Sequence, residues 1–286
     1  MRYNFLISDI HIGVELPFPL EISIESLNFY CGTNDADVDI LFVFNSVDQM
    51  ELPSKKGIDV LEYYFYPDNA GCAIYFCKMP ERNPVFSINW DYLVSRRIMC
   101  KYVSGNEWRM SYSRNILSLI NLETVLLKHD RILLHSSFIR WQNQGILFTA
   151  PSGTGKSTQA KLWEEYEHAE VLNGDRAALE KTKGSWTAWG LPYAGTSGIY
   201  RNESAPISAI VVLRQSKENH MRRLLPREAL RYIYPELTNH RWDPWFADRV
   251  WNLMSELICE VPIYLLECRP DREAVQLVKK TILKGE

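Results

Sequence analysis

The segment ILFTAPSGTGKSTQA (residues 146–160) sets the class of the second half of the chain. Its apolar start predicts a strand, its centre a loop of small residues, and its end the first turns of a helix. In such a unit the backbone N–H groups of the loop wrap around a phosphate, and the helix N-terminus adds partial positive charge. The pattern G-x-x-x-x-G-K-[ST] is met with Ala150 in the first position, which is tolerable where the backbone needs no positive φ.

The residues of this loop have separate chemical roles. Gly153 and Gly155 let the backbone approach a phosphate closely. Lys156 reaches the terminal phosphates as a mobile cation, and Ser157 ligates Mg²⁺ through its hydroxyl. The alternative is a glycine-rich helix N-terminus that binds nothing. We expect ATP and Mg²⁺ as ligands, with ATP contacted by Ser152, Gly153, Thr154, Gly155, Lys156, Ser157 and Thr158.

An acidic residue follows the loop at the end of the next expected strand, AEVLNGDRAAL (residues 169–179). Phosphoryl transfer needs a second metal contact and a group that takes the proton of the acceptor. Asp175 can hold Mg²⁺ directly or through water, or it can act as the general base. It can also be a simple turn former after Asn-Gly. Arg176 either steadies phosphate charge or pairs with a carboxylate.

A histidine lies on the strand RILLHSSFIRW (residues 131–141), which leads by a hairpin into the loop. We take His135 as a candidate catalytic residue, although a lone histidine on an apolar strand is often structural. Ser136 and Ser137 beside it give no nucleophilic triad, because no Ser-His-Asp arrangement can be read from linear order.

The second half alternates strands and helices, which predicts an α/β domain with some antiparallel strands. Expected here are the hairpin into the loop and a second hairpin that turns at residues 182–184. We also expect helices at 156–166, 226–234, 243–259 and 270–283, and strands at 170–173, 207–215 and 262–268.

The first half is rich in short β-branched and aromatic runs, which predict strands at 3–8, 20–30, 38–47, 61–66 and 72–78. A helical pattern follows at 111–129, with Ser113 as its N-cap. We place a β-rich domain for substrate recognition or assembly at residues 1–105 and the nucleotide-binding domain at 106–286.

The composition is that of an ordinary globular protein. The 286 residues are 46% hydrophobic and 23% charged, with a formal net charge of −3. This charge gives no indication of a nucleic-acid or anionic-membrane partner, and we expect neither. The start, MRYNFLISDIHIG, lacks the apolar core of a signal peptide, and the six cysteines contain no C-x-x-C pair. We expect a cytoplasmic protein with buried, reduced thiols.

Residues of about 132–215 resemble the kinase domain of bacterial HPr kinase/phosphorylase, a fold related to the nucleotide domain of phosphoenolpyruvate carboxykinase. The resemblance rests on LLHSSFIRWQNQGILFTAPSGTGKST (133–158) and VLNGDRAAL (171–179). It implies that His135 is the family histidine near the phosphates. The family carries two adjacent aspartates, a base and a metal contact, whereas this chain has Gly174 before Asp175. Either Asp175 performs both roles or another carboxylate contributes.

Shorter relatives of that family include kinases of ribosomally made peptides such as lasso-peptide precursors. They also have a β-rich N-terminal portion and a segment similar to GLPYAGTSGIYRNESAPISAIVVL (190–213). The resemblance implies that residues 195–198, followed by Arg201, line the phosphate site; an ordinary turn-rich loop is the alternative. It also leaves a homo-oligomer possible, because HPr kinases form hexamers.

Three functions are compatible with these residues. The first is an ATP-dependent kinase that phosphorylates a hydroxyl of a peptide, protein or small molecule, with Asp175, His135 and Lys156 as catalytic residues and with Ser157 and Asp175 around Mg²⁺. The second is a nucleotide-binding regulatory or assembly module without phosphoryl transfer. The third, a carboxykinase, would need a dedicated Mn²⁺ site and clamps for a substrate carboxylate, and no spacing in the chain supplies them.

Overall fold

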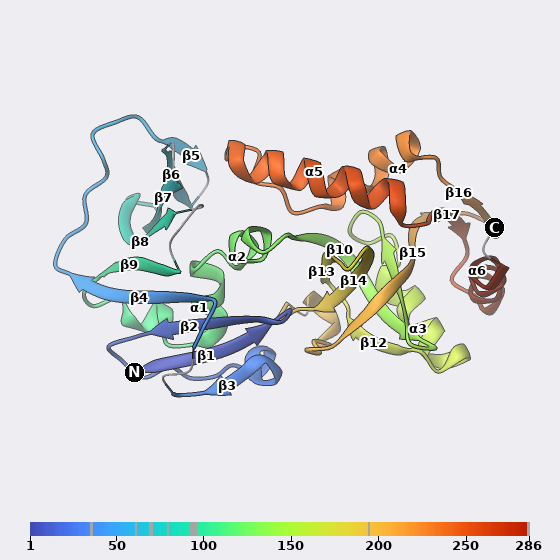
Figure 1. Cartoon of the computed structure of the whole chain (residues 1–286), viewed down its shortest axis with the longest axis horizontal. Coiled ribbons are helices and arrows are strands. Elements are labelled where there is room, and N and C mark those ends of the chain that lie inside the picture. The colour runs from blue at the N-terminus through green and yellow to red at the C-terminus, as the bar shows by residue number, and fades with distance from the viewer. Residues whose placement is uncertain are drawn as a thin grey trace. The chain divides into compact units, whose positions relative to one another are not determined.

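The computed structural model describes residues 1–34, 37–60, 62–68, 71–78, 80–91, 96–193 and 195–284 (Figure 1). The chain divides into two compact units, Met1–Leu122 and Glu123–Glu286. The predicted fold class is confirmed, because a β-rich unit precedes an α/β unit that carries the phosphate loop.

Residues 106–122, expected in the second domain, lie with the first unit. Backbone hydrogen bonds hold this segment to the N-terminal part of the chain. Glu21 N donates to Ser111 O at 2.8 Å, and Ser113 N donates to Glu21 O at 2.9 Å. Ser23 N also donates to the Ser113 hydroxyl at 2.9 Å.

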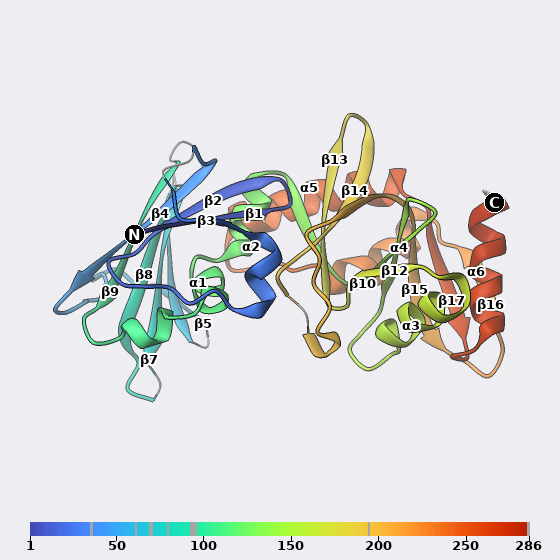
Figure 2. The same ribbon diagram turned by 90° about the horizontal axis from the view of Figure 1, so that it is seen from below.

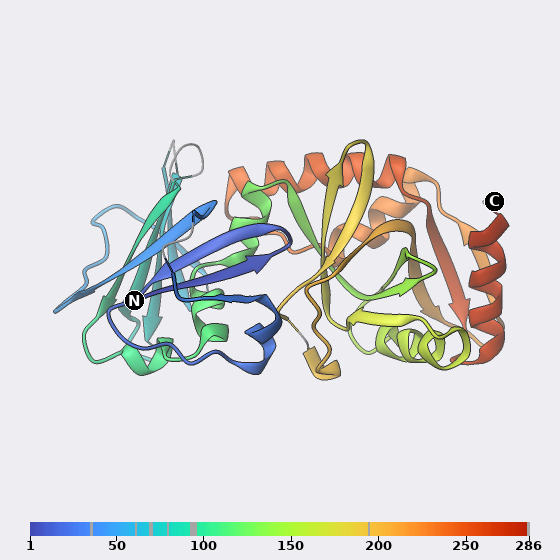
Figure 3. The ribbon, with the colours of Figure 1, turned by 60° about the horizontal axis from the view of Figure 1, so that its bottom comes forward.

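The first unit is built on a nine-stranded sheet, seen in blue to green in Figure 3. Its strands, in spatial order, are β3 (Tyr30–Gly32), β1 (Arg2–Ile7), β2 (Ile10–Glu15), β4 (Ile40–Val47), β9 (Arg97–Val103), β8 (Asn83–Asp91), β7 (Gly71–Lys78), β6 (Tyr63–Pro67) and β5 (Ile58–Val60). β4 pairs in parallel with β2 and β9, and the other neighbours are antiparallel. Along β9, buried Ile98, Cys100 and Tyr102 alternate with exposed residues, the period of a strand with one buried face.

Three of the expected strands of this unit, 3–8, 38–47 and 72–78, are confirmed by β1, β4 and β7. The strand expected at 61–66 corresponds to β6, with Leu61 outside the described residues. The strand expected at 20–30 is wrong over most of its length, because a 3-10 helix, η1 (Ile24–Phe29), precedes the short β3. Ser26 N donates to Ser23 O at 2.9 Å, and this turn starts the helix.

The single helix expected at 111–129 is also wrong, because two helices occupy this region after η2 (Glu107–Met110). α1 (Ser113–Leu119) and α2 (Leu122–Lys128) are separated at Asn121, whose φ of 55° lies in the left-handed region and ends the first helix. Ser113 is not the N-cap: Tyr112 is, while the Ser113 hydroxyl hydrogen-bonds Ser23.

The strands of the second unit form a path that closes on itself. The strands are β10 (Arg131–Trp141), β11 (Gln144–Thr149), β12 (Glu170–Asn173), β13 (Arg176–Thr182), β14 (Ser185–Gly190), β15 (Ser204–Gln215), β16 (His220–Arg223) and β17 (Ile263–Cys268). Pairing runs from β11 through β10, β13 and β14 to β15, and β15 pairs in parallel with β11. The β13–β14 hairpin extends away from this ring (Figure 2). β15 also pairs in parallel with β17, so the ring continues into an open sheet.

The helices of this unit are α3 (Lys156–Glu167), η3 (Gly195–Ser197), α4 (Pro226–Ile233), η4 (Tyr234–Glu236), α5 (Pro244–Glu260) and α6 (Arg272–Lys284). They confirm the four expected helices, and the expected strands and hairpins of this half are confirmed too, whereas β16 was not expected. At the start of α5, Asp243 accepts a hydrogen bond from Phe246 N at 3.3 Å, and Pro244 occupies the first turn.

Two cores lie on opposite faces of the strands that lead to the phosphate loop. Phe148 packs in a core that includes Trp163 of α3 and Val275 of α6, whereas its neighbour Leu147 packs in a core that includes Phe246 and Met254 of α5. Figure 1 shows the same layering, with α4 and α5 on one side of β10 and β15 and α3 on the other. Because both faces of β11 are buried, its end is a rigid base for the loop.

Four of the six cysteines are buried and all six are free thiols, as expected, but Cys31 and Cys259 are exposed. Within the described ranges, no helix combines the length and apolar character that a membrane span requires.

Candidate functional site

The phosphate loop leaves β11 and enters α3 through two left-handed glycines. Gly153 has a φ of 80° and Gly155 a φ of 121°, values that side chains with a Cβ rarely adopt. A Cβ built on either residue would meet no atom within 4 Å. Both glycines therefore border open space, and the N–H groups of the first turn of α3 have no intrahelical acceptors. This geometry suits a phosphate.

Ala150 does not disturb this geometry. It is 1% exposed and packs in the core under α3, and its φ is not positive. Alanine is therefore tolerated at this position, because the backbone does not need a positive φ there. Its carbonyl oxygen accepts a hydrogen bond from Lys156 Nζ at 2.8 Å.

Lys156 is the charged centre of the loop. It is only 7% exposed, and burial lowers the pKa of its ammonium group. The negative charges of Glu236 and Asp175 act in the opposite direction on that pKa and favour the charged form. The loop lysine therefore lies in the electrostatic field of two carboxylates from distant parts of the chain.

The register of β10 brings the predicted residues together. His135 pairs with Arg176 on β13, and Ser136 pairs with Thr149, the last residue before the loop. The Thr149 hydroxyl donates to His135 O at 2.9 Å, and Ser136 N donates to Asp175 O at 3.0 Å. His135 thus lies on the strand between the phosphate loop and the acidic turn.

Asn173 fixes the turn that carries Asp175. Its side-chain oxygen accepts from Asp175 N at 2.8 Å and from Arg176 N at 3.0 Å. Its amide donates to Leu191 O and Tyr193 O at 2.8 and 2.9 Å. Asn173 is fully buried, and all four of these bonds go to backbone atoms of the protein. They fix the backbone of Asp175 relative to the segment of Leu191 and Tyr193.

Packing explains why a glycine precedes Asp175. A Cβ built on Gly174 would overlap the side chain of Ser197, and one on Gly195 would lie 3.0 Å from Asp175 Cβ. The turn at residues 195–198 therefore rests on the acidic turn. A second aspartate at position 174 would have no room while Ser197 keeps its place.

Glu236 is the functional candidate that no motif in the sequence indicated. Its Oε2 lies 2.9 Å from His135 Nδ1, and its side chain is 10% exposed. Glu236 ends η4, and the following residues are pinned to β10 by an antiparallel bridge between Leu237 and Leu134. Thr238 N also donates to Leu133 O at 3.0 Å. When Nδ1–H is donated to the carboxylate, the other ring nitrogen of His135 stays available to a ligand.

Arg176 pairs with carboxylates. Its guanidinium lies 3.6 Å from Glu123 Oε1 and 3.7 Å from Asp175 Oδ2, and it lies over the ring of Tyr193 at 5.6 Å. Burial raises the pKa of Glu123, an effect that its own backbone hydrogen bond and the Arg176 charge oppose. Arg176 therefore balances the acidic side chains around it.

These residues line one cleft of about 460 Å³, which we call the acidic cleft. Its side chains include Glu123, His135, Asp175, Arg176, Glu236 and His240. His240 stacks on Trp242 and Phe246 with ring centroids 5.0 and 4.2 Å apart. Burial, helped by the Arg176 charge, lowers the pKa of His240 from 6.5 to about 4, so this ring is neutral near pH 7.

The remaining predicted residues are distributed around the loop. Ser152 is exposed, Ser157 is half-buried in the first turn of α3, and Thr158 lines a cavity beside the loop. Arg201 lines neither the acidic cleft nor the two cavities that border the loop; its guanidinium lies 3.6 Å from Glu170 Oε2 and 3.9 Å from Glu203 Oε1. The side chain of Thr196 lies outside the described residues.

The donor set fits magnesium better than a metal held by protein alone. Within the described ranges, no three His, Cys, Asp or Glu side chains are grouped so as to hold a metal ion. Mg²⁺ is commonly bound by one or two oxygen side chains together with phosphate oxygens of a substrate. The Ser157 hydroxyl and the Asp175 carboxylate have this chemistry.

Comparison with known proteins adds little to this geometry. No model of a protein family matches the chain, and no curated protein matches it. Among solved structures, the Hpr(Ser) kinase/phosphatase from Coxiella burnetii is similar with 12% sequence identity and a TM-score of 0.31. The similarity covers 54% of this chain and 88% of that one. With a TM-score this low, the roles of individual residues rest on the contacts described above.

The packing of Gly174 on Ser197 gives a testable consequence. Replacement Gly174→Ala forces the new methyl group into Ser197, and we expect a loss of about 1–3 kcal/mol in the free energy of unfolding measured with urea. In the Ser197→Gly variant there is room for the methyl group. Gly174→Ala should therefore cost less stability in that background than in the parent protein. Equal costs in both backgrounds would contradict the contact.

The neutral His240 makes folding stability depend on pH. Its pKa is lower in the folded state, so the unfolded chain binds the extra proton between about 6.5 and 4. Stability from this group is full above pH 6.5 and is lost as the pH falls toward 4. Between about pH 7 and pH 5, His240→Gln should therefore lose up to about 2 kcal/mol less stability than the parent in urea titrations. Parallel losses in the two proteins would refute this role.

Proposed function

We propose that this protein is an ATP-dependent kinase that transfers the γ-phosphoryl group to a hydroxyl of a peptide, protein or small molecule, with Mg²⁺. The observation that carries the proposal is the position of Lys156. This buried loop lysine lies in the field of Asp175 and Glu236, and Glu236 contacts His135. A phosphate loop next to a carboxylate and an oriented histidine is the arrangement that phosphoryl transfer needs.

The phosphates bind the loop in this proposal. The backbone N–H groups of residues 153–158 and the ammonium of Lys156 hold the β- and γ-phosphates. Lys156 Nζ then exchanges its hydrogen bonds to the Ala150 and Pro151 carbonyls for bonds to phosphate oxygens. Ser157 and Asp175 hold Mg²⁺, which neutralises charge on the phosphate oxygens when it is bound.

The acceptor hydroxyl enters the acidic cleft. As its oxygen forms a bond to the γ-phosphorus, the bond from phosphorus to the β,γ-bridging oxygen breaks and ADP leaves. Asp175 takes the hydroxyl proton, because its carboxylate lines the cleft and is fixed by the Asn173 turn. His135 lies next to the γ-phosphate, where a ring N–H donates to a phosphate oxygen.

Glu236 supplies the second carboxylate that position 174 lacks. Its role differs from that of the missing aspartate, because Glu236 lies on η4 and contacts His135. We assign it as a positioning residue that fixes the tautomer and the orientation of the imidazole ring.

The kinase proposal predicts a loss of transfer when its charged groups are removed. Lys156→Ala should abolish transfer, and Asp175→Asn should lower kcat about 10²–10⁴-fold if Asp175 is the base. The measurement is the transfer of labelled γ-phosphate from ATP into fractionated extract of the source cell, with peptides and metabolites separated. Lys161→Ala on the exposed face of α3 and Asp248→Asn on α5 serve as matched controls that retain transfer.

Two results would count against this assignment. Wild-type transfer by Asp175→Asn would remove Asp175 as the base. ATP binding without transfer into any fraction, at high protein concentration, would instead favour a nucleotide-binding regulatory or assembly module.

Glu236 gives a separate prediction. Glu236→Gln keeps the size of the side chain but removes its charge, so we expect kcat to fall roughly 10–100-fold while KM for ATP changes less than about twofold. A residue that only supports the fold would change the urea midpoint and leave kcat of the folded fraction intact. Glu164→Gln, on the exposed face of α3, is the control for the amide substitution.

A further inference from the structure

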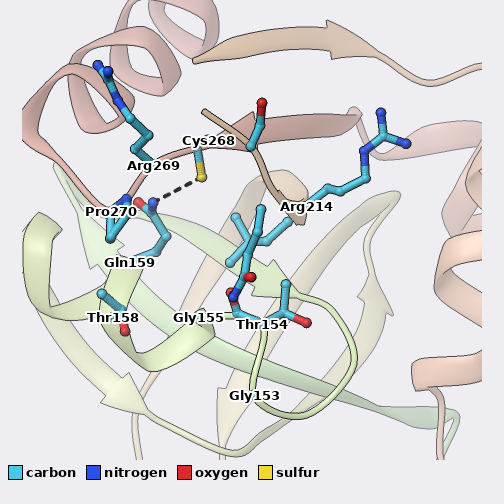
Figure 4. A pocket seen from close by; sticks show the side chains of 12 residues that line it. Gly153, Thr154, Gly155, Thr158, Gln159, Arg214, Cys268, Arg269 and Pro270 are labelled. Carbon is cyan, nitrogen blue, oxygen red and sulfur yellow. Dashed lines mark hydrogen bonds between the residues drawn. The ribbon is translucent and has the colours of Figure 1, made fainter. Parts of the chain in front are cut away.

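A second cavity borders the phosphate loop and shares no residue with the acidic cleft (Figure 4). We call it the loop cavity. It measures about 360 Å³ and is formed by the loop, the first turn of α3, and the carboxyl ends of β15 and β17 with the residues that follow them. β15 and β17 are parallel neighbours, and ligands of α/β sheets bind outside the carboxyl ends of such strands.

The proposed function fixes the direction of a bound nucleotide. If the γ-phosphate lies with Asp175 and His135, the nucleoside must leave the loop on the side that these residues do not occupy. Two cavities border the loop there, the loop cavity and a more open one of about 550 Å³ that reaches Tyr232. They share Gly153, Thr154 and the end of β15, so a nucleoside can extend from the loop into either.

Gln159 distinguishes the loop cavity from its neighbour. This side chain lines the cavity and is 2% exposed. Its Nε2 donates to Cys268 Sγ at 3.4 Å, the bond drawn in Figure 4. Its Oε1 is buried and has no hydrogen-bond partner within the part of the chain that the structure describes. A buried acceptor without a donor is rare in folded proteins, so this oxygen points to a ligand that supplies one.

The charges on the rim of the cavity indicate that this ligand is not a second anion. Arg214 forms an ion pair with Glu267. Arg269 lies 2.9 Å from Asp271 and 2.8 Å from Glu273. Because both arginines are already paired, the cavity suits a neutral group with hydrogen-bond donors on its edge.

We propose that the loop cavity binds the base of the nucleotide, and that Gln159 Oε1 accepts a hydrogen bond from the exocyclic amino group of adenine. The inference rests on the proposed function for the direction of the phosphates. The Cys268 contact uses an N–H of the amide, so the oxygen is the amide atom left without a partner.

The first test compares three ligands by titration calorimetry with Mg²⁺ present: ATP, purine riboside 5′-triphosphate, which lacks the 6-amino group, and inorganic tripolyphosphate, which lacks the nucleoside. ATP should bind about tenfold more tightly than the analogue. Gln159→Leu should make the two nucleotides equal and leave tripolyphosphate binding unchanged. Equal affinity of the unmodified protein for ATP and the analogue would overturn the role of Gln159.

The second test fills the cavity. Ser216 lines it, whereas the adjacent Lys217 is exposed and does not. Ser216→Trp should weaken ATP binding at least about tenfold and spare tripolyphosphate, while Lys217→Trp should change neither. ATP affinity in Ser216→Trp equal to that of Lys217→Trp would overturn the base site.

Tripolyphosphate binding distinguishes a failure of the proposed function from a failure of the base site alone. If the unmodified protein binds neither tripolyphosphate nor ATP, the proposed function fails and the base site fails with it. If it binds tripolyphosphate as tightly as ATP, the phosphate site stands and only the base site is overturned. The ligand comparison needs only the unmodified protein, so it decides the question even where a variant does not fold.

Discussion

The candidate site depends on the pairing of one strand, β10, with two partners. β11 pairs with its later half and leads into the phosphate loop, and β13 pairs with its earlier half and follows the acidic turn. Because pairing fixes the register, His135 must lie between Thr149 and Asp175. A slip of one residue would move His135 to the other face and separate the loop from the acidic residues.

Buried polar contacts then set the details that strand pairing leaves open. Asn173 uses both ends of its amide to hold the Asp175 turn against the segment of Leu191 and Tyr193. Ser197 occupies the space beside Gly174, and Glu236 brings a carboxylate to His135 from η4. The two carboxylates lie on different elements, and their negative charge partly offsets the cost of burying the Lys156 ammonium group.

Local patterns were enough to predict the loop and most elements of the second unit, but not β16 or the separate α2. The loop spacing, the strand before it and the helix after it are all within fifteen residues, so their signals are local. Glu236 could not be found in this way, because 101 residues separate it from His135 and a 3-10 turn carries no spacing pattern. The helix expected at 111–129 failed for a related reason: Asn121 adopts a left-handed φ that apolar periodicity does not reveal.

We propose that a nucleotide binds with its γ-phosphate between Lys156 and the acidic cleft. A crystal structure of the whole protein with Mg²⁺ and a non-hydrolysable ATP analogue tests it most directly. We expect phosphate density along residues 153–158, with the terminal phosphate in contact with Lys156 and next to Asp175 and His135. A nucleotide bound in the opposite direction, or bound away from the loop, would contradict it.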